Sequence, residues 1–147
     1  MDIIRISNSD PMIDTLIQMS IDWENEHSCE GYGRNNKSTF IDKTIYVVLD
    51  NDEIIGYLYG TFETSSKTNT VQKENDRIFE VEEIFIKKEY RNKGIGSKLF
   101  EYVENDIKDK VDIILLSTAT KDYKSILHFY INEVGMTFWN ARLYKKV

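Results

Sequence analysis

The sequence predicts an α/β fold with a mixed, mostly antiparallel central sheet and helices on both faces. Short stretches rich in β-branched and aromatic residues alternate with stretches whose apolar residues recur at helical spacing, in the order β-α-β-β-β-α-β-α-β. The chain has 147 residues, of which 41% are hydrophobic and 30% charged. This size and composition predict one globular domain that spans residues 1–147.

The first strand and the first helix are expected near the start of the chain. Residues 2–7 (DIIRIS) form the strand. Asp10 is a suitable N-cap and Pro11 a suitable first helical residue, so a helix is expected to begin there. Its apolar residues at helical spacing are Ile13, Leu16, Ile17 and Ile21. The polar segment 24–40 is interpreted as a loop or a short second helix.

A hairpin and a long loop follow. Residues 44–49 (TIYVVL) and 54–62 (IIGYLYGTF) are rich in strand formers, and the turn-forming residues 50–53 separate them. Residues 64–76 are polar and contain no aromatic side chain, which predicts a long flexible loop.

The second half of the chain alternates strands and helices. We expect a strand at 77–86, a helix at 94–109, a buried strand at 111–117, a helix at 123–134 and a final strand at 136–147. The apolar stripe of the first of these helices is typical of core packing and consists of Ile95, Leu99, Val103 and Ile107.

The turn between the strand at 77–86 and the next helix is the most informative segment. It reads Arg91-Asn92-Lys93-Gly94-Ile95-Gly96. Glycines at a helix start leave the backbone N–H groups accessible, and the helix N-terminus adds partial positive charge. The segment Lys87–Lys98 also carries five basic residues against one acid. The sequence therefore predicts a phosphate or pyrophosphate site here, although a merely solvated basic surface is the alternative.

The spacing of this turn excludes two common nucleotide motifs. The P-loop pattern is absent, and Leu99 occupies the third glycine position of a dinucleotide fingerprint. The pattern [R/Q]-x-x-G-x-[G/A], read as Arg91, Gly94 and Gly96, instead resembles the acyl-CoA signature of the GNAT superfamily of N-acetyltransferases. Later in the chain, Phe129-Tyr130 ahead of Val134-Gly135-Met136 resembles the FY…GF element of that family.

The resemblance implies acetyl-CoA as co-substrate and no metal. In that family the pantetheine arm pairs with the strand before the signature. The cofactor-binding residues expected from the resemblance are Ile84, Phe85, Ile86, Arg91, Asn92, Lys93, Gly94, Ile95, Gly96 and Ser97. Two positions depart from the family pattern, since Tyr123 replaces a pantetheine-binding asparagine and Ile126 replaces an alanine.

Acetyl transfer to an amine needs a base, an oxyanion site and a proton donor for the thiolate. Because side chains alternate along a strand, Glu80 and Glu82 are expected on one face and Glu83 on the other, unless a bulge changes the parity. The resemblance favours Glu82 as the base, followed by Glu80. The alternative is that these acids only keep the strand soluble and hold a cationic substrate.

Tyr130 matches the tyrosine that family members place near the CoA sulfur, which makes it the expected acid. Its alternative role is core packing on the apolar side of its helix. Cys29 is not expected to be a nucleophile, because a thioester is already activated.

The acceptor is expected to be a cationic amine. Acids and aromatic rings gather after the first helix, and both suit a cation. The substrate-binding candidates are Trp23, Glu24, Glu26 and Tyr32. Polyamines, aminoglycosides and peptides with a lysine or free N-terminus all fit. The alternative is that Trp23 covers the core and the acids are solvated surface.

Composition and net charge limit the kinds of partner that are expected. A net charge of −6 argues against nucleic-acid binding, and no apolar run is long enough to span a membrane. One cysteine and no secretory signal lead us to expect a cytoplasmic protein, and two histidines with one cysteine argue against zinc. Only twelve residues follow Gly135, so a last strand supplied by a partner chain, and hence a homodimer, is one expectation.

The resemblance, together with the acidic and aromatic residues after the first helix, implies an N-acetyltransferase that moves the acetyl group of acetyl-CoA to a primary amine of a small cationic acceptor. Acetylation of a peptide or protein amine is one alternative. A non-catalytic acyl-CoA-binding module is the other.

Overall fold

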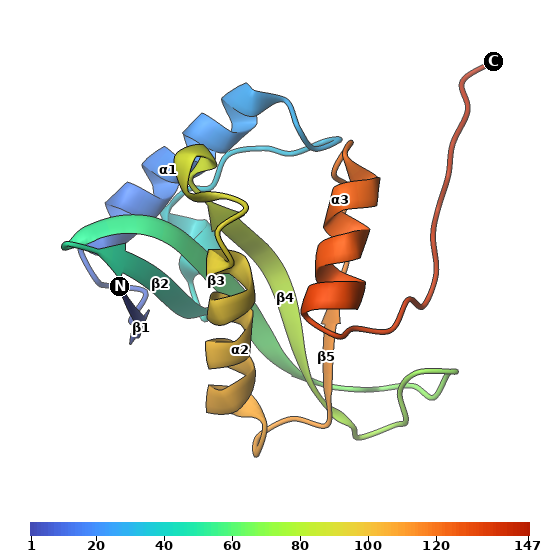
Figure 1. The fold of residues 1–147 in the computed structure, drawn as a ribbon. Helices are drawn as coiled ribbons and strands as arrows, with labels where there is room; N and C mark the ends of the chain where they lie inside the picture. Colours follow the sequence, from blue (N-terminus) through green and yellow to red (C-terminus); the bar gives the residue numbers. More distant parts are fainter.

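The computed structural model describes all residues, 1–147, and contains one five-stranded sheet in the order β1-β2-β3-β4-β5 (Figure 1). The strands are β1 (Asp2–Ile6), β2 (Thr44–Asp50), β3 (Glu53–Thr64), β4 (Arg77–Ile86) and β5 (Ile113–Leu116). The first four strands pair antiparallel, and only β4 and β5 are parallel. The predicted mixed, mostly antiparallel sheet is confirmed.

Helices cover both faces of this sheet. They are α1 (Met12–Glu26), α2 (Ile95–Ile107) and α3 (Tyr123–His128), which continues as a π-helical turn over Phe129–Glu133. Apolar residues of α1, including Leu16, pack on one face with Ile45 and Tyr57. Residues of α2 pack on the other face, where Leu99 lies against the sheet, and the helices α2 and α3 stand on that same side (Figure 1).

The predicted start of α1 is one residue early. Asp10 does accept a hydrogen bond from the Met12 N–H at 2.9 Å, but Pro11 occupies the cap position and the helix begins at Met12. The hairpin turn between β2 and β3 is made by Asn51 and Asp52, both with positive φ, and this geometry suits a tight two-residue turn.

The segment 64–76 is an ordered loop in the structure. Its two ends are joined by the hydrogen bond from Ser65 N–H to Asp76 O at 2.9 Å, and the buried Gln72 side chain donates to Ser65 Oγ at 2.6 Å. Side-chain hydrogen bonds therefore replace the apolar contacts that its composition lacks. No helix of the chain is both long and apolar enough to cross a membrane.

The parallel pairing of β4 with β5 is short, and this creates a wedge in the sheet. Only four residue pairs connect them, from Ile78 opposite Ile113 to Val81 opposite Leu116. Beyond Val81, β4 runs on to Ile86 without a β5 partner. Along that edge the backbone of Glu82–Phe85 has no neighbouring strand, as the predicted pairing with a pantetheine arm requires.

The expected strand at 136–147 is wrong. The segment has no regular structure and leaves the end of α3 as an extended tail that stands away from the body (Figure 1). Gly135, with φ of 84°, redirects the chain, and Leu143 is 96% exposed. A strand needs a neighbouring strand for its backbone groups, and the tail has none. The observed order is therefore β-α-β-β-β-α-β-α.

Candidate active site

A cavity of about 300 Å³ opens at the wedge between β4 and β5. The wall on the β4 side consists of Val81, Glu82, Glu83 and Ile84. The opposite walls come from the end of β5, the segment 117–120, α3 and the loop that follows α1. Three glutamates line this cavity and no lysine or arginine does, so its potential favours a cation.

The signature turn lies beyond the open end of β4. Asn92 and Gly94 both have positive φ, 59° and 74°, and Gly94 is the N-cap residue of α2. None of the backbone N–H groups from Asn92 to Ser97 donates a hydrogen bond within the protein. A left-handed turn at a helix N-terminus with free N–H groups is suited to binding an anion. This geometry agrees with the predicted pyrophosphate site.

At Gly96 the small size of glycine matters for packing, whereas at Gly94 its backbone conformation matters. A Cβ at this position would lie 3.2 Å from the Phe129 ring, so the small residue lets α3 approach the start of α2. Ser97 Oγ lies 3.0 Å from Glu133 Oε2, at the end of the same π-helical turn. The two sequence motifs, the Gly turn and Phe129-Tyr130, therefore contact each other directly.

Arg91, the first residue of the signature, points toward α1. Its Nη1 and Nη2 donate to the two carboxylate oxygens of Glu26 at 2.8 Å each, and its Nε donates to Ile86 O at 2.8 Å. The guanidinium also lies over the Phe85 ring, 5.2 Å from its centroid. Arg91 thus ties the turn to the end of α1 and to the end of β4.

A bulge in β4 changes which acid reaches the cavity. Tyr59 pairs with Glu83 while Gly60 pairs with Val81, so Glu82 is an extra residue on β4. Glu83 consequently lies on the same face as Tyr57 and Tyr59, the face covered by α1. The expectation that Glu83 faces away from the other acids is wrong for this reason.

Glu83 is the most enclosed carboxylate at the site, with 7% of its surface exposed. Asn35 Nδ2 and Tyr32 Oη donate to its Oε1 at 2.8 and 3.1 Å, and Tyr57 Oη donates to the same oxygen. Tyr59 Oη donates to Oε2 at 3.3 Å. Burial raises the pKa of Glu83 above its ordinary value, and the four donors oppose this shift.

The three tyrosines around Glu83 remain neutral. Burial, followed by the charge of Glu83, raises the pKa of each phenol, Tyr32, Tyr57 and Tyr59. They therefore stay hydrogen-bond donors to the carboxylate at any pH at which a protein is normally assayed.

The two acids favoured from the sequence lie nearer solvent. Glu82 lines the cavity, forms an ion pair with Lys43 Nζ at 2.6 Å and accepts from Thr61 Oγ1 at 2.7 Å. Glu80 does not line it, and burial, then the charges of Glu63 and Glu82, raise the pKa of Glu80.

Tyr130, the acid expected from the sequence, lines the cavity. It is 7% exposed and its hydroxyl has no hydrogen-bond partner in the protein. Burial and, secondarily, Cys29 raise the pKa of Tyr130 to about 12, so the phenol is protonated near neutrality.

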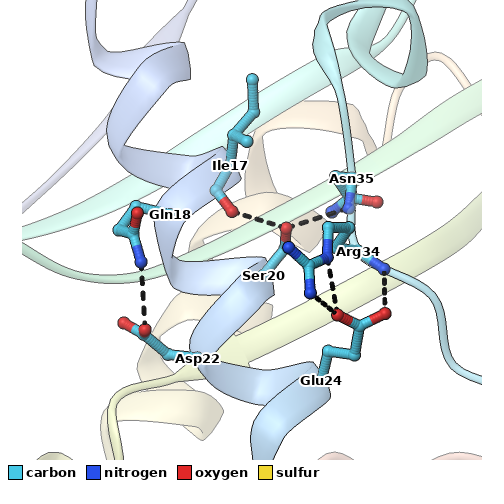
Figure 2. Close-up of polar contacts among 7 residues, drawn as sticks. All are labelled: Ile17, Gln18, Ser20, Asp22, Glu24, Arg34 and Asn35. Atoms are coloured by element: carbon cyan, nitrogen blue, oxygen red, sulfur yellow. Dashed lines mark hydrogen bonds and ion pairs between the residues drawn. The ribbon is translucent and has the colours of Figure 1, made fainter.

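The loop after α1 is fastened to that helix by polar contacts (Figure 2). The backbone N–H of Asn35 donates to Ser20 Oγ at 2.9 Å, and Ser20 Oγ donates to Ile17 O at 2.7 Å. Next to it, Arg34 Nε donates to Glu24 Oε2 at 2.6 Å. These contacts hold Asn35 where its side chain reaches Glu83.

The four acceptor candidates separate into two groups. Trp23 and Tyr32 line the cavity, with ring centroids 4.4 Å apart, and the Trp23 indole N–H donates to Ser28 Oγ at 3.0 Å. Glu24 and Glu26 do not line the cavity, and each carboxylate is paired with an arginine, Arg34 or Arg91.

The sequence analysis missed Asn35, Tyr57 and Tyr59 as site residues. Alternation along β3 would have placed the two tyrosines on one face, but no sequence signal locates Asn35 beside a residue 48 positions away.

Comparison with known proteins also indicates an acetyltransferase. The family model described as the acetyltransferase (GNAT) domain matches residues 42–146. No curated protein matches the chain.

Solved structures that resemble this one share its fold at low sequence identity. An aminoglycoside acetyltransferase, meta-AAC0020, from an uncultured soil metagenomic sample in complex with trehalose, has a TM-score of 0.73 and 15% identity, covering 99% of this chain and 95% of that chain. A tetramutant of the BH1408 protein from Bacillus halodurans has a TM-score of 0.75 and 16% identity, covering 100% of both chains.

The aminoglycoside N-acetyltransferase AAC(6')-Iy in complex with CoA has a TM-score of 0.67 and 12% identity, covering 99% of both chains. These similarities concern the fold, whereas the family model spans well over half of the chain. The protein therefore belongs to the GNAT family of acetyl-CoA-dependent N-acetyltransferases.

Proposed function

We propose that residues 1–147 form a single acyl-CoA N-acyltransferase domain that moves the acetyl group of acetyl-CoA directly to a primary amine of a small cationic acceptor. The observation that carries the proposal is the content of one cavity. It holds a buried carboxylate, Glu83, and an unpaired phenol, Tyr130, at the wedge that leads to the free N–H groups of the signature turn.

The cofactor is proposed to lie along the open edge of β4. The pyrophosphate binds the N–H groups of Asn92–Ser97 with help from Lys93, and the pantetheine pairs with Ile84–Ile86 in the absence of a β5 partner. This arrangement directs the thioester toward Tyr130.

We assign the base to Glu83 in preference to Glu82 and Glu80. A base works best when its pKa is close to the working pH, and burial raises the pKa of Glu83. The carboxylate of Glu82 is already held by Lys43 and Thr61, so its proposed role is to hold the acceptor at the cavity mouth by a hydrogen bond. Glu83 takes a proton from the ammonium, directly or through a water, and Tyr130 protonates the departing CoA thiolate.

The proposed class of acceptor follows from the residues that line the cavity. Glu30, Glu82 and Glu83 supply negative charge, and Trp23 and Tyr32 present aromatic faces, so a compact polycation fits. Two of the structures with the same fold are aminoglycoside acetyltransferases, which makes aminoglycosides the first acceptors to try, with polyamines next.

The test is thiol release from acetyl-CoA with a panel of acceptors: aminoglycosides, spermidine, single amino acids and a lysine peptide. A neutral sugar without an amine, such as trehalose, is the matched negative control. A rate with one cationic amine and none with the sugar supports the proposal. Tight acetyl-CoA binding without turnover on any amine contradicts it and supports a binding module.

A further inference from the structure

Cys29 is the single cysteine of the chain and is held in a defined place on the cavity wall. It forms an isolated antiparallel bridge with Thr120, on the segment that follows β5. Two backbone hydrogen bonds flank this bridge: Glu30 N–H to Ala119 O at 2.9 Å and Lys121 N–H to Ser28 O at 2.8 Å. The loop around Cys29 is therefore attached to the β5 side of the wedge.

The same cavity contains the unpaired hydroxyl of Tyr130. Every side-chain nitrogen or oxygen that is fully shut off from solvent has a hydrogen-bond partner in this protein. Because Tyr130 is 7% exposed and its hydroxyl has no partner, that oxygen opens on the cavity. An enclosed, unpaired donor of this kind indicates where a ligand atom binds.

Cys29 and Tyr130 are also electrostatically coupled. After burial, the cause that raises the pKa of Tyr130 to about 12 is the neighbouring Cys29. Both residues line the same cavity of about 300 Å³.

In the function proposed above, on which this step rests, Tyr130 gives its proton to the CoA thiolate. After each turnover the CoA sulfur would therefore lie beside Tyr130, in the cavity whose wall also carries Cys29. We propose that Cys29 is a redox modification site at which bound CoA forms a mixed disulfide with the protein.

The chemistry balances with hydrogen peroxide as the oxidant. The Cys29 thiol attacks peroxide, which gives the sulfenic acid and one water. The thiol of bound CoA then attacks the Cys29 sulfur, the S–S bond forms, and the hydroxyl leaves as a second water. Peroxide accepts two electrons in total, one from the sulfur of Cys29 and one from the sulfur of CoA.

The modification would switch the enzyme off. A CoA held covalently in the wedge blocks acetyl-CoA, and its sulfur obstructs the path of the acceptor. A small thiol reductant would reverse it. Disulfides in reducing compartments are typically transient and redox-sensing, and a single accessible thiol beside a bound thiol is suited to that use.

The experiment measures intact mass after the protein is treated with CoA and peroxide. We expect addition of one CoA, loss of activity in parallel, and recovery of both mass and activity with dithiothreitol. Cys29→Ser is the matched control and should gain no CoA. Glutathione in place of CoA at the same concentration should add at least ~10-fold more slowly, because it is not held in the wedge.

Gly94→Asp tests whether binding directs the reaction. It should reduce CoA addition to the rate seen with glutathione and leave the glutathione rate unchanged. Equal rates for CoA and glutathione in the unmodified protein would overturn the proposal, as would absence of a CoA adduct.

Two measurements on the reduced protein separate this proposal from the function on which it rests. Normal acetyl-CoA binding and turnover without an adduct overturn the redox site alone. Absence of acetyl-CoA binding overturns both.

Discussion

The two carboxylate oxygens of Glu26 accept hydrogen bonds from Nη1 and Nη2 of Arg91, each at 2.8 Å, and this pair joins the last residue of α1 to the first residue of the signature turn. The pair has fixed planar geometry, and about a quarter to a third of each side chain is exposed. The pair thus fixes the end of α1 relative to the turn proposed to bind pyrophosphate.

Glu26→Gln should therefore weaken acetyl-CoA binding. The amide cannot accept both bonds, so Arg91 and the turn lose their fixed position. For a partly exposed pair we expect about a 2- to 10-fold increase in the KM for acetyl-CoA, with kcat nearly unchanged. Glu24→Gln is the matched control, because Glu24 pairs with Arg34 on the same helix without contacting the turn. Equal KM values in both variants would show that the pair only stabilises the fold.

Ser20→Ala should act on the proposed base, Glu83, indirectly through Asn35. The fully buried Ser20 hydroxyl accepts from the backbone N–H of Asn35 (Figure 2). The Asn35 side chain in turn donates to Glu83. Loss of the Ser20 hydroxyl leaves a buried N–H unpaired, which costs about 1–3 kcal/mol. We expect a lower melting temperature and kcat reduced on the order of 10-fold. Gln18→Ala, at an exposed position on the same helix, is the control, and a loss of stability without a change in kcat would contradict a positioning role.

Glu83→Gln tests the base directly. Because burial raises the pKa of Glu83, the acidic limb of the pH–rate profile should lie above the ordinary value of 4.5. The variant should lose that limb and about 10²- to 10⁴-fold in kcat. Glu82→Gln and Glu80→Gln should keep the limb. If either of them removes it, the base belongs to that residue, as the sequence alone had favoured.

The same shift has a consequence for stability. The folded protein binds the Glu83 proton more tightly than the unfolded chain, since its pKa is raised above 4.5. The stabilisation from this proton is fully present below pH 4.5 and is lost as the pH rises through the raised value. The free energy of unfolding of the native protein, measured relative to Glu83→Gln, should therefore fall across that interval. A difference that does not vary with pH would contradict the raised pKa.

Tyr130→Phe should lower kcat by about 10²-fold and leave the dissociation constant for acetyl-CoA unchanged. Stability should change little, because the hydroxyl has no hydrogen-bond partner to lose. Stopped assays for kcat, calorimetry for binding and thermal melts separate these effects. An unaltered kcat would make Tyr130 a packing residue.

Gly94→Asp should abolish detectable acetyl-CoA binding, since a carboxylate would stand against the pyrophosphate. Gly94 has a φ of 74°, so any side chain adds backbone strain. Gly94→Asn is the matched control, because asparagine tolerates this conformation and has nearly the same shape without the charge. Binding should persist, though weakened, in the asparagine variant. Equal affinity in both would remove the pyrophosphate from this turn.

Much of the fold could be predicted because it depends on local patterns. The apolar spacing of α2, the strand formers of β2 and β3 and the turn at Gly94 each act within a few residues. The last strand could not be predicted in this way. Strand formation at 136–147 depends on a neighbouring strand, and the composition of the segment does not show whether one is available.

For the same reason, only some residues of the candidate site could be predicted from the sequence. Tyr130 and the signature turn belong to contiguous motifs, and the structure brings Tyr130 to the cavity. Choosing among the acids of β4 required knowledge of a one-residue bulge, which inverts the side-chain parity beyond it. Glu26 looked like part of an acidic acceptor site, but its partner Arg91 is 65 residues away and only the folded chain joins them.

The wedge between β4 and β5 should also affect the thermal stability of the protein. Four residue pairs are the whole backbone connection between β4 and β5, so the strand that carries Glu83 has an unfinished edge. A pantetheine arm lying there would act as a surrogate strand and supply the missing hydrogen bonds. Acetyl-CoA would then be a structural component of the working enzyme as well as its reagent, and the melting temperature would report cofactor occupancy before any chemistry occurs.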